Sequence, residues 1–187
     1  MEMEKVFEEI RRCKKCDLYR TRKNPVPGEG NVHAKIMLIG EAPGYNEDLQ
    51  GRPFVGKAGK LLDELLKIAR LERSEVFITN VVKCRPPGNR KPNREEIKAC
   101  SPFLKTQIRI IKPELILTLG NVATQFIFEE FSLKFETMSK LHGKIFKVSN
   151  LWLRTKVIPM YHPAAVLRNP NLRKVVEEDW KNVRKIL

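Results

Sequence analysis

A glycine-rich loop with several acidic side chains follows the first strongly apolar run of the chain. The run, 36–39, has consecutive apolar residues, which is typical of a buried parallel strand. The loop extends to Gly59 and carries Glu41 and Glu47. Loops longer than about 12 residues in compact domains are usually functional or disordered, and the prolines and apolar residues of this loop argue against disorder. Because ligands of open α/β sheets bind beyond the carboxyl ends of the strands, we expect this loop to form the floor of a site.

Residues 51–57 of this loop spell G-x-x-x-x-G-K, the pattern of a phosphate-binding loop. Ala58 stands where that motif needs a Ser or Thr hydroxyl for magnesium. Pro53 removes one of the backbone N–H groups that would hold phosphate. No predicted strand runs directly into Gly51. We therefore set NTP hydrolysis aside.

The four cysteines of the chain, Cys13, Cys16, Cys84 and Cys100, form a second group that could do chemistry. Cys13 and Cys16 have the C-x-x-C spacing that lets two thiolates bind one metal centre, which argues against four unrelated buried cysteines. Disulfides are disfavoured in an intracellular chain, and the C-x-x-C does not follow a strand, as it would in a thioredoxin-type redox pair. Four thiolates fit either tetrahedral zinc or a [4Fe–4S] cluster, and spacing does not choose between them. Either centre would join the N-terminal segment to the loop after the second strand.

The charge balance favours a polyanionic partner. Lys and Arg total 36 against 22 Asp and Glu, a net charge of +14 over 187 residues. A generally basic proteome or a thermophile surface would explain the same numbers. No apolar run approaches the roughly 18 residues of a membrane span. Residues 1–12 are charged and amphipathic and lack a signal-peptide core, so we expect an intracellular, cytoplasmic protein with no membrane partner.

Strand and helix patterns alternate along the chain, which predicts an α/β fold with a parallel sheet covered on both faces. We expect one domain over residues 1–187, without repeats or linkers. The predicted core strands are 36–39, 76–82, 115–119 and 157–160, and a hairpin is predicted from 145–148 and 151–153. The predicted helices are 4–12, 60–70, 93–112, 121–129 and 171–187. A basic loop, 85–92, and a second unusual loop, 161–170, follow two of the core strands.

An ordered set of short motifs resembles one family. The set comprises Gly40-Glu41-Ala42-Pro43-Gly44, Gly51-Arg52-Pro53-Phe54-Val55-Gly56, Asn80, His162-Pro163-Ala164-Ala165 and the four cysteines. It is similar to the family-four, iron–sulfur uracil-DNA glycosylases, and the match runs from Cys13 to Pro170, most of the chain. The resemblance implies a three-layer α/β/α sandwich with a four-stranded parallel sheet and a structural [4Fe–4S] cluster at the four cysteines. It also implies a protein, expected to be a monomer, that excises uracil from uracil-containing DNA by hydrolysis and leaves an abasic site.

Under this resemblance two residues would be catalytic. A base inside a duplex is out of reach, so it must first be flipped into a pocket. Glu41 would orient or deprotonate the attacking water. His162 would donate a hydrogen bond to uracil O2 as negative charge develops there. A loop cap and a structural histidine are the ordinary alternatives, although the position of His162 directly after a strand favours a site.

Further residues would bind the base. Phe54 would stack on it, and Asn80, at the end of a strand, would bind its Watson–Crick edge. Gly40 and the backbone of Ala42 would contact it. Glu47 would crowd C5 and exclude thymine, although the neighbouring Asp48 makes this the weakest assignment. An ordinary core phenylalanine and a turn-capping asparagine are the alternatives for Phe54 and Asn80.

Basic and apolar residues outside the base pocket would bind DNA. Arg85, Arg90 and Lys91 would contact phosphates and so add affinity without sequence information. Leu167 would enter the space left by the flipped base, with Arg168 on a phosphate. The alternative for Leu167 is hydrophobic support of the last helix.

Two other functions compete with hydrolysis. A non-enzymatic, metal-stabilised nucleic-acid-binding protein would explain the charge and the cysteines, but not polar residues that meet at strand ends. A relative that traps DNA covalently would need a histidine near the basic loop. The histidines are His33, His142 and His162, and residues 85–92 contain none, which favours hydrolysis.

Overall fold

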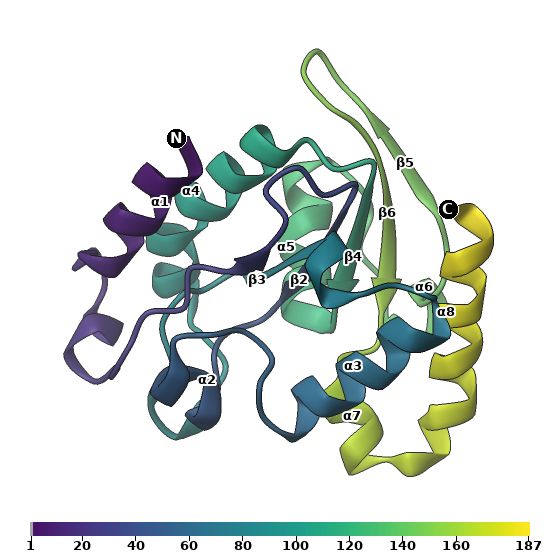
Figure 1. Ribbon diagram of the computed structural model, residues 1–187, viewed down its shortest axis with the longest axis horizontal. Coiled ribbons are helices and arrows are strands. Elements are labelled where there is room, and N and C mark those ends of the chain that lie inside the picture. Colours follow the sequence, from purple (N-terminus) through teal and green to yellow (C-terminus); the bar gives the residue numbers. More distant parts are fainter. Residues whose placement is uncertain (1) are drawn as a thin grey trace.

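A six-stranded sheet forms the centre of the computed structural model, which describes residues 2–187 (Figure 1). The strands are β1 (Glu29–Gly30), β2 (Ile36–Gly40), β3 (Val76–Asn80), β4 (Leu115–Leu119), β5 (Phe146–Ser149) and β6 (Arg154–Met160), in the order β1-β3-β2-β4-β6-β5. The four central strands are parallel, and β1 and β5 pair antiparallel at the two edges. The expectation of a four-stranded parallel sheet therefore describes the centre and is wrong for the sheet as a whole.

The two edge strands have different origins. At β1 the chain turns back along β3, with Gly30 opposite Phe77. Gly30 has φ +124°, and a Cβ there would collide with the Val76 carbonyl oxygen, so the close approach requires glycine. At the other edge β5 pairs directly with β6, and the expected strand 151–153 is instead part of the turn. The Asn150 side chain closes that turn by accepting hydrogen bonds from the backbone of the next residues.

Helices cover both faces of the sheet. They are α1 (Glu2–Arg11), α2 (Tyr45–Gln50), α3 (Lys57–Ile68), α4 (Arg94–Ile111), α5 (Asn121–Glu130), α6 (Met138–Leu141), α7 (Pro163–Arg168) and α8 (Arg173–Ile186). Short 3₁₀ turns lie at Asp17–Arg20, Arg73–Glu75, Pro87–Asn89 and Pro170–Leu172. No helix in residues 2–187 is long and apolar enough to span a bilayer.

Successive residues of the central strands face opposite layers, which explains their continuous apolar sequence. Met37 and Phe77 pack with the apolar sides of α1, α4 and α5. Leu38 and Ile78 pack with α3 and α8. Figure 1 shows α1 and α4 side by side on one flank and α3, α7 and α8 on the other. The arrangement matches the expected helix-covered parallel sheet.

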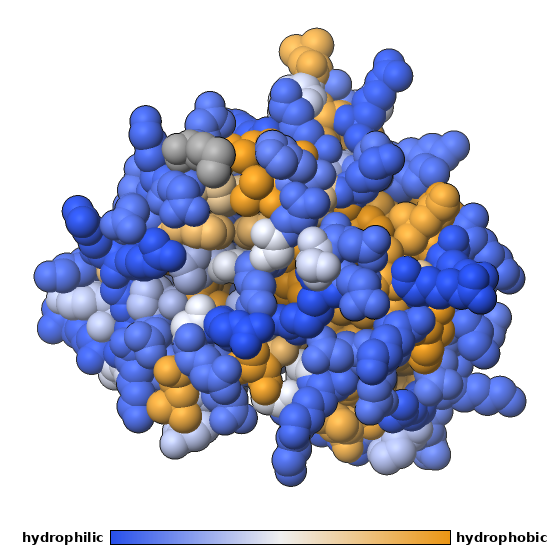
Figure 2. Space-filling model, viewed as in Figure 1, coloured by the Kyte–Doolittle hydropathy of each residue, from blue (hydrophilic) through white to orange (hydrophobic). Residues whose placement is uncertain are grey.

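Helix ends agree with the capping signals in the sequence. The Asn93 side chain accepts from the Glu96 backbone N–H at 2.9 Å, and the Glu96 carboxylate accepts from the Asn93 N–H at 2.9 Å, which forms a capping box at the start of α4. The helix ends at Ile111, and the capping residue Lys112 has φ +48° and precedes Pro113. Figure 2 shows mostly hydrophilic residues over the visible face, as the high charge content leads one to expect.

Candidate active site and cysteine centre

An open cavity of about 660 Å³ lies at the carboxyl ends of the parallel strands. Of the twelve residues that the sequence assigned to catalysis, base binding or DNA binding, nine line the cavity and three do not. The cavity is lined by Glu41, Ala42, Glu47, Phe54, Asn80, Arg90, Lys91, His162 and Arg168, among others. Gly40, Arg85 and Leu167 do not line it. The parallel register brings residues from four separate chain segments to one edge of the sheet, as the strand-end argument predicts.

Asn80 and Phe54 lie together against Gly40. Asn80 and Gly40 are register partners at the ends of β3 and β2. A Cβ on Gly40 would collide with the Asn80 side-chain oxygen and lie 2.7 Å from the Phe54 ring. Gly40 therefore serves as the spacer that lets two cavity residues approach, rather than as a wall of the cavity itself. Phe54 has φ +50°, a conformation that side-chain-bearing residues rarely adopt, and both it and Asn80 are almost fully buried.

His162 faces Phe54 across the cavity wall. The two ring centroids are 5.6 Å apart with 32° between the planes. The His162 Nδ1 accepts a hydrogen bond from the Ala164 N–H at 3.0 Å, so in the neutral ring the proton is on Nε2. Burial, and then the charge of Arg168, lowers the pKa of His162 to about 4, although Glu47 opposes the shift. The ring is therefore a neutral hydrogen-bond donor at physiological pH.

Glu41 follows β2 and is half-buried at the cavity. Its backbone carbonyl accepts from the Val82 N–H at 3.1 Å, which continues the β2–β3 pairing one residue past the strands. Burial raises the pKa of the Glu41 carboxyl, and the positive charges of Lys91 and Arg168 oppose that rise. In the described part of the chain its carboxylate has no protein hydrogen-bond partner. A carboxylate of raised pKa that faces a cavity is suited to general-base work.

The two acids of α2 hold the glycine-rich loop in place. The Glu47 carboxylate accepts from the N–H groups of Gly44, Val55 and Gly56 at 3.0, 2.9 and 2.8 Å. Asp48 is buried and accepts from the N–H groups of Lys23 and Asn24, in the N-terminal segment. The loop expected between β2 and α3 thus contains a short helix, and both of its acids have structural partners. Glu47 also lines the cavity.

The match to known proteins agrees with this geometry. The Uracil DNA glycosylase superfamily matches residues 27–184. The chain is 52% identical over 183 residues to the Type-4 uracil-DNA glycosylase of Saccharolobus solfataricus, covering 97% of this chain and 85% of that protein. It is 54% identical over 185 residues to the enzyme of the same name from Sulfurisphaera tokodaii, and the match covers 98% of this chain and 84% of that protein. It is 44% identical over 188 residues to the Type-4 uracil-DNA glycosylase of Thermotoga maritima, and the match covers 99% of this chain and 94% of that protein.

The chain belongs to the Uracil DNA glycosylase superfamily, in its type-4 group. The family expected from the sequence motifs is thereby confirmed. Several residues that carried the resemblance, among them Glu41, Phe54 and His162, line the cavity, whereas the four cysteines lie elsewhere.

Two of the basic residues that this glycosylase was expected to use on DNA have partners within the protein. Arg90 forms a two-pronged ion pair with Glu96 at 2.8 and 2.9 Å. The Arg85 guanidinium lies 5.4 Å from the centre of the Tyr45 ring, and its Nε donates to Asn89 at 2.6 Å. Lys91 and Arg168 are exposed at the rim of the cavity.

Leu167 is 49% exposed on α7, outside the cavity lining. It is therefore not buried as a support for the last helix.

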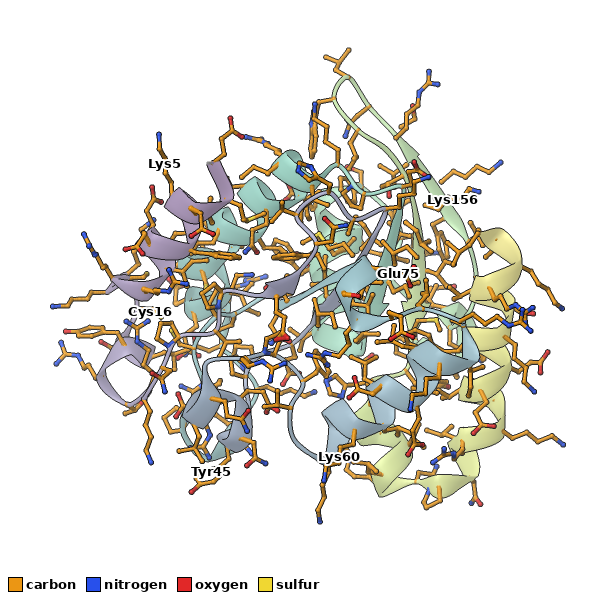
Figure 3. The ribbon with its side chains drawn as sticks, viewed as in Figure 1. Lys5, Cys16, Tyr45, Lys60, Glu75 and Lys156 are labelled. Carbon is orange, nitrogen blue, oxygen red and sulfur yellow. The ribbon has the colours of Figure 1, made fainter. Side chains whose placement is uncertain are left out.

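The four cysteines of the glycosylase line one small apolar cavity on the flank of the sheet. Figure 3 shows Cys16 just past the end of α1. Among residues 2–187 no group of three His, Cys, Asp or Glu side chains is arranged to hold a metal ion. Two of the sulfur atoms accept hydrogen bonds. The Lys83 backbone N–H donates to Cys100 Sγ at 3.2 Å, and an Arg22 guanidinium N–H donates to Cys84 Sγ at 3.0 Å. Burial raises the pKa of the Cys100 thiol to about 12, so a thiolate there needs a bound cation to offset its charge.

Sequence reasoning missed several residues of this glycosylase that the fold makes important. Arg22 also donates to the Cys13 carbonyl oxygen at 3.1 Å, so it supports two of the cysteine positions. Tyr161 and Met138 line the cavity. Lys83 is completely buried beside the cysteines, where burial lowers its pKa to about 7. One feature of the sequence could have indicated Lys83: it directly follows the apolar residues at the end of a strand and directly precedes a cysteine.

Proposed function

We propose that this chain hydrolyses the N-glycosidic bond of deoxyuridine in DNA, releasing free uracil and leaving an abasic site. The observation that carries the proposal is the meeting of Glu41, Phe54, Asn80 and His162 at one cavity, in a chain about half identical to type-4 uracil-DNA glycosylases. The chain would act as a monomer, as one domain, on uracil that arises from cytosine deamination. A non-enzymatic nucleic-acid-binding protein would not need this constellation.

The base enters the cavity after it is flipped from the DNA. Phe54 stacks on one face of uracil. The Asn80 amide accepts a hydrogen bond from N3–H with its oxygen and donates one to O4 with its nitrogen. The backbone of Ala42 adds a contact to the base. Three backbone N–H groups hold the Glu47 carboxylate in place. Because it cannot move aside, Glu47 excludes the C5 methyl group of thymine.

His162 and Glu41 carry out the bond cleavage. As the bond from C1′ to N1 breaks, the electron pair moves onto uracil, and His162 Nε2–H donates a hydrogen bond to O2. The neutral ring is favoured because burial lowers its pKa to about 4. Glu41 orients a water molecule and takes its proton while the water oxygen bonds to C1′. The uracil anion takes up a proton from solvent as it leaves, Glu41 returns its proton to solvent, and the water oxygen remains on C1′ as a hydroxyl.

The DNA backbone binds around the cavity rim. Lys91 and Arg168 contact phosphates, since both side chains are exposed there. Arg85 and Arg90 add contacts at the same loop, with Arg90 limited by its ion pair to Glu96. Leu167 enters the space that the flipped base leaves, which its exposure allows.

The four cysteines would hold a [4Fe–4S] cluster, which on binding supplies a covalent cross-link between the N-terminal segment and the loop after β3. The donor set supports this assignment, because all four thiols line one apolar cavity and N–H groups bond two of the sulfurs. Cys13 and Cys16 would anchor the segment after α1, and Cys84 and Cys100 the loop and α4. The cluster has no part in the glycosylase steps.

Replacing Cys84 with Ser is expected to abolish visible colour and to lower the melting temperature by about 10 °C or more. Binding energy of a structural metal centre is folding energy, and each kcal/mol lost lowers the melting temperature by about 2–4 °C in a domain of this size. Metal analysis and thermal melts of the two proteins, purified in parallel, provide the measurement. Stoichiometric zinc without iron in the unaltered protein would exclude the cluster.

Replacing Asn80 with Ala is expected to lower uracil excision by about 10- to 100-fold or more, because two polar atoms of the base lose their partners on desolvation. Asn80→Asp is expected to shift preference from uracil toward cytosine, since a carboxylate accepts from N4 and repels O4. The measurement is abasic-site formation in matched oligonucleotides with mispaired U or C. Nonspecific DNA affinity serves as the control and stays unchanged, because it depends on phosphate contacts. If both variants excise uracil at the rate of the unaltered protein, Asn80 only stabilises a turn and does not bind the base.

A further inference from the structure

Lys83 is a buried lysine outside the cavity, and its side chain donates hydrogen bonds to groups at the end of β3 and on α4. The side chain is 1% exposed and lies between β3 and α4. Its Nζ donates to Thr79 Oγ1 at 2.6 Å, to the Asn80 backbone carbonyl at 2.8 Å and to Gln107 Oε1 at 2.7 Å. The Thr79 hydroxyl gives its own hydrogen to the Pro27 carbonyl. All three partners can therefore only accept, and the ammonium group satisfies each of them.

The partners of Lys83 are themselves fixed. Gln107 Nε2 donates to the Pro27 carbonyl oxygen at 2.8 Å, which leaves Oε1 directed at Lys83. The Lys83 backbone carbonyl accepts from the Val26 N–H at 2.7 Å. The network thus ties the end of β3 to α4 and to the segment before β1. Every member is a buried group with a partner, so the network holds one geometry.

The network includes the backbone carbonyl of Asn80. Asn80 is the one residue that both lines the cavity and accepts a hydrogen bond from Lys83 Nζ. Its side chain is confined in front by Gly40 and Phe54. The peptide group that follows Asn80 is held on both sides: its carbonyl oxygen accepts from Lys83 Nζ at 2.8 Å, and the Val81 N–H donates to the Gly40 carbonyl oxygen at 2.9 Å. An apolar residue of similar volume would avoid the desolvation of an ammonium group but would leave three buried acceptors without a donor, so positioning and stability need separate readouts.

We propose that Lys83 is a positioning residue that aims the Asn80 amide at the flipped base and so sets the preference for uracil. The inference rests on the proposed role of Asn80 in the base pocket. Lys83 does not touch the base, and it acts through the Asn80 peptide group. Thr79 and Gln107 support it by holding its ammonium group in place.

Lys83→Met keeps the length of the side chain and removes its donors. Single-turnover excision of uracil at saturating enzyme is expected to fall about 10- to 100-fold, the range for a buried acceptor left without a partner. Inhibition by free uracil is expected to weaken by a similar factor. Affinity for an abasic-site oligonucleotide and the iron content are expected to stay at the unaltered level, because neither depends on Asn80.

A double-mutant cycle separates positioning from a purely structural role. If Lys83 acts through Asn80, then Lys83→Met lowers the rate by less than about 3-fold in an Asn80→Ala background. Equal losses in the two backgrounds would overturn the proposal, as would an unchanged rate for the single variant. A failure of the proposed function looks different, because the unaltered protein would then release no uracil.

Two further variants keep the test decisive if Lys83→Met does not fold. Gln107→Leu removes an acceptor of Lys83 on α4, outside the cavity, and is expected to slow uracil excision in the same direction by a smaller factor. Thr118→Val is the matched control, since it removes a buried hydroxyl that bonds Thr124 at 2.9 Å without contact to the network. It is expected to lower the melting temperature and to leave the rate unchanged. A Gln107→Leu protein with the rate of the Thr118→Val control would count against the proposal.

Discussion

Glu41→Gln is expected to slow uracil excision by about 10²–10⁴-fold, the usual contribution of a general base, while DNA affinity is retained. The amide keeps the size of the side chain but cannot take a proton from water. The carboxyl of Glu41 is half-buried, and the positive charges of Lys91 and Arg168 act on it. Single-turnover rates at saturating enzyme measure the chemical step alone.

The pH dependence of the cleavage rate tests the same role of Glu41. Burial raises the pKa of Glu41, so the active carboxylate is lost as pH falls through that raised value. The rate of the unaltered protein should therefore decline on the acid side at a pH above the ordinary range for glutamate, and Glu41→Gln should lack that decline. Glu129→Gln, an exposed acid on α5, is the matched control and should behave as the unaltered protein. An unchanged rate and pH profile for Glu41→Gln would remove Glu41 from the chemistry.

His162→Ala is expected to lower the rate of uracil excision by about 10²–10³-fold, the typical effect of losing one donor to a developing anion. The Ala164 N–H donates to Nδ1 of the ring, which leaves the Nε2–H free to donate a hydrogen bond. Because burial lowers the pKa of the ring to about 4, the donor is neutral and should remain effective well below pH 6.5. His162→Gln, whose amide can also donate, is expected to recover part of the loss.

The control for this experiment is His33→Ala, since His33 is exposed and does not line the cavity. Far-ultraviolet spectra and melting curves establish that the His162 variants are folded. A folded His162→Ala protein that cleaves at the rate of the His33→Ala control would rule out the donor role.

The centre of the fold could be predicted from sequence because it depends on local signals. Continuous apolar runs predict buried parallel strands, and parallel strands bring Glu41, Asn80 and His162 to one edge. The Asn93 capping signal likewise located the start of α4. The edges of the sheet carry weaker signals: β1 has two residues, and the turn between β5 and β6 contains the apolar residues that suggested a strand of their own.

Other parts of the site depend on contacts between distant segments, which a single sequence does not display. The bond from Gln107 to the Pro27 carbonyl joins residues 80 positions apart, and that from Arg22 to Cys84 joins residues 62 apart. The need for glycine at position 40 is also a contact between distant segments, because a Cβ there would collide with the Asn80 side-chain oxygen and the Phe54 ring. Arg90 was assigned to DNA from its charge alone, and the ion pair with Glu96 became evident only in the fold.

The central claim, that this cavity hydrolyses the bond to uracil, is tested most directly by following both products in ¹⁸O-labelled water. A stoichiometric excess of protein is incubated with an oligonucleotide that carries one uracil, and the products are analysed by mass spectrometry. We expect one free uracil per strand and one ¹⁸O atom in the abasic sugar. DNA bound without release of uracil, or a covalent adduct between protein and DNA, would contradict hydrolysis.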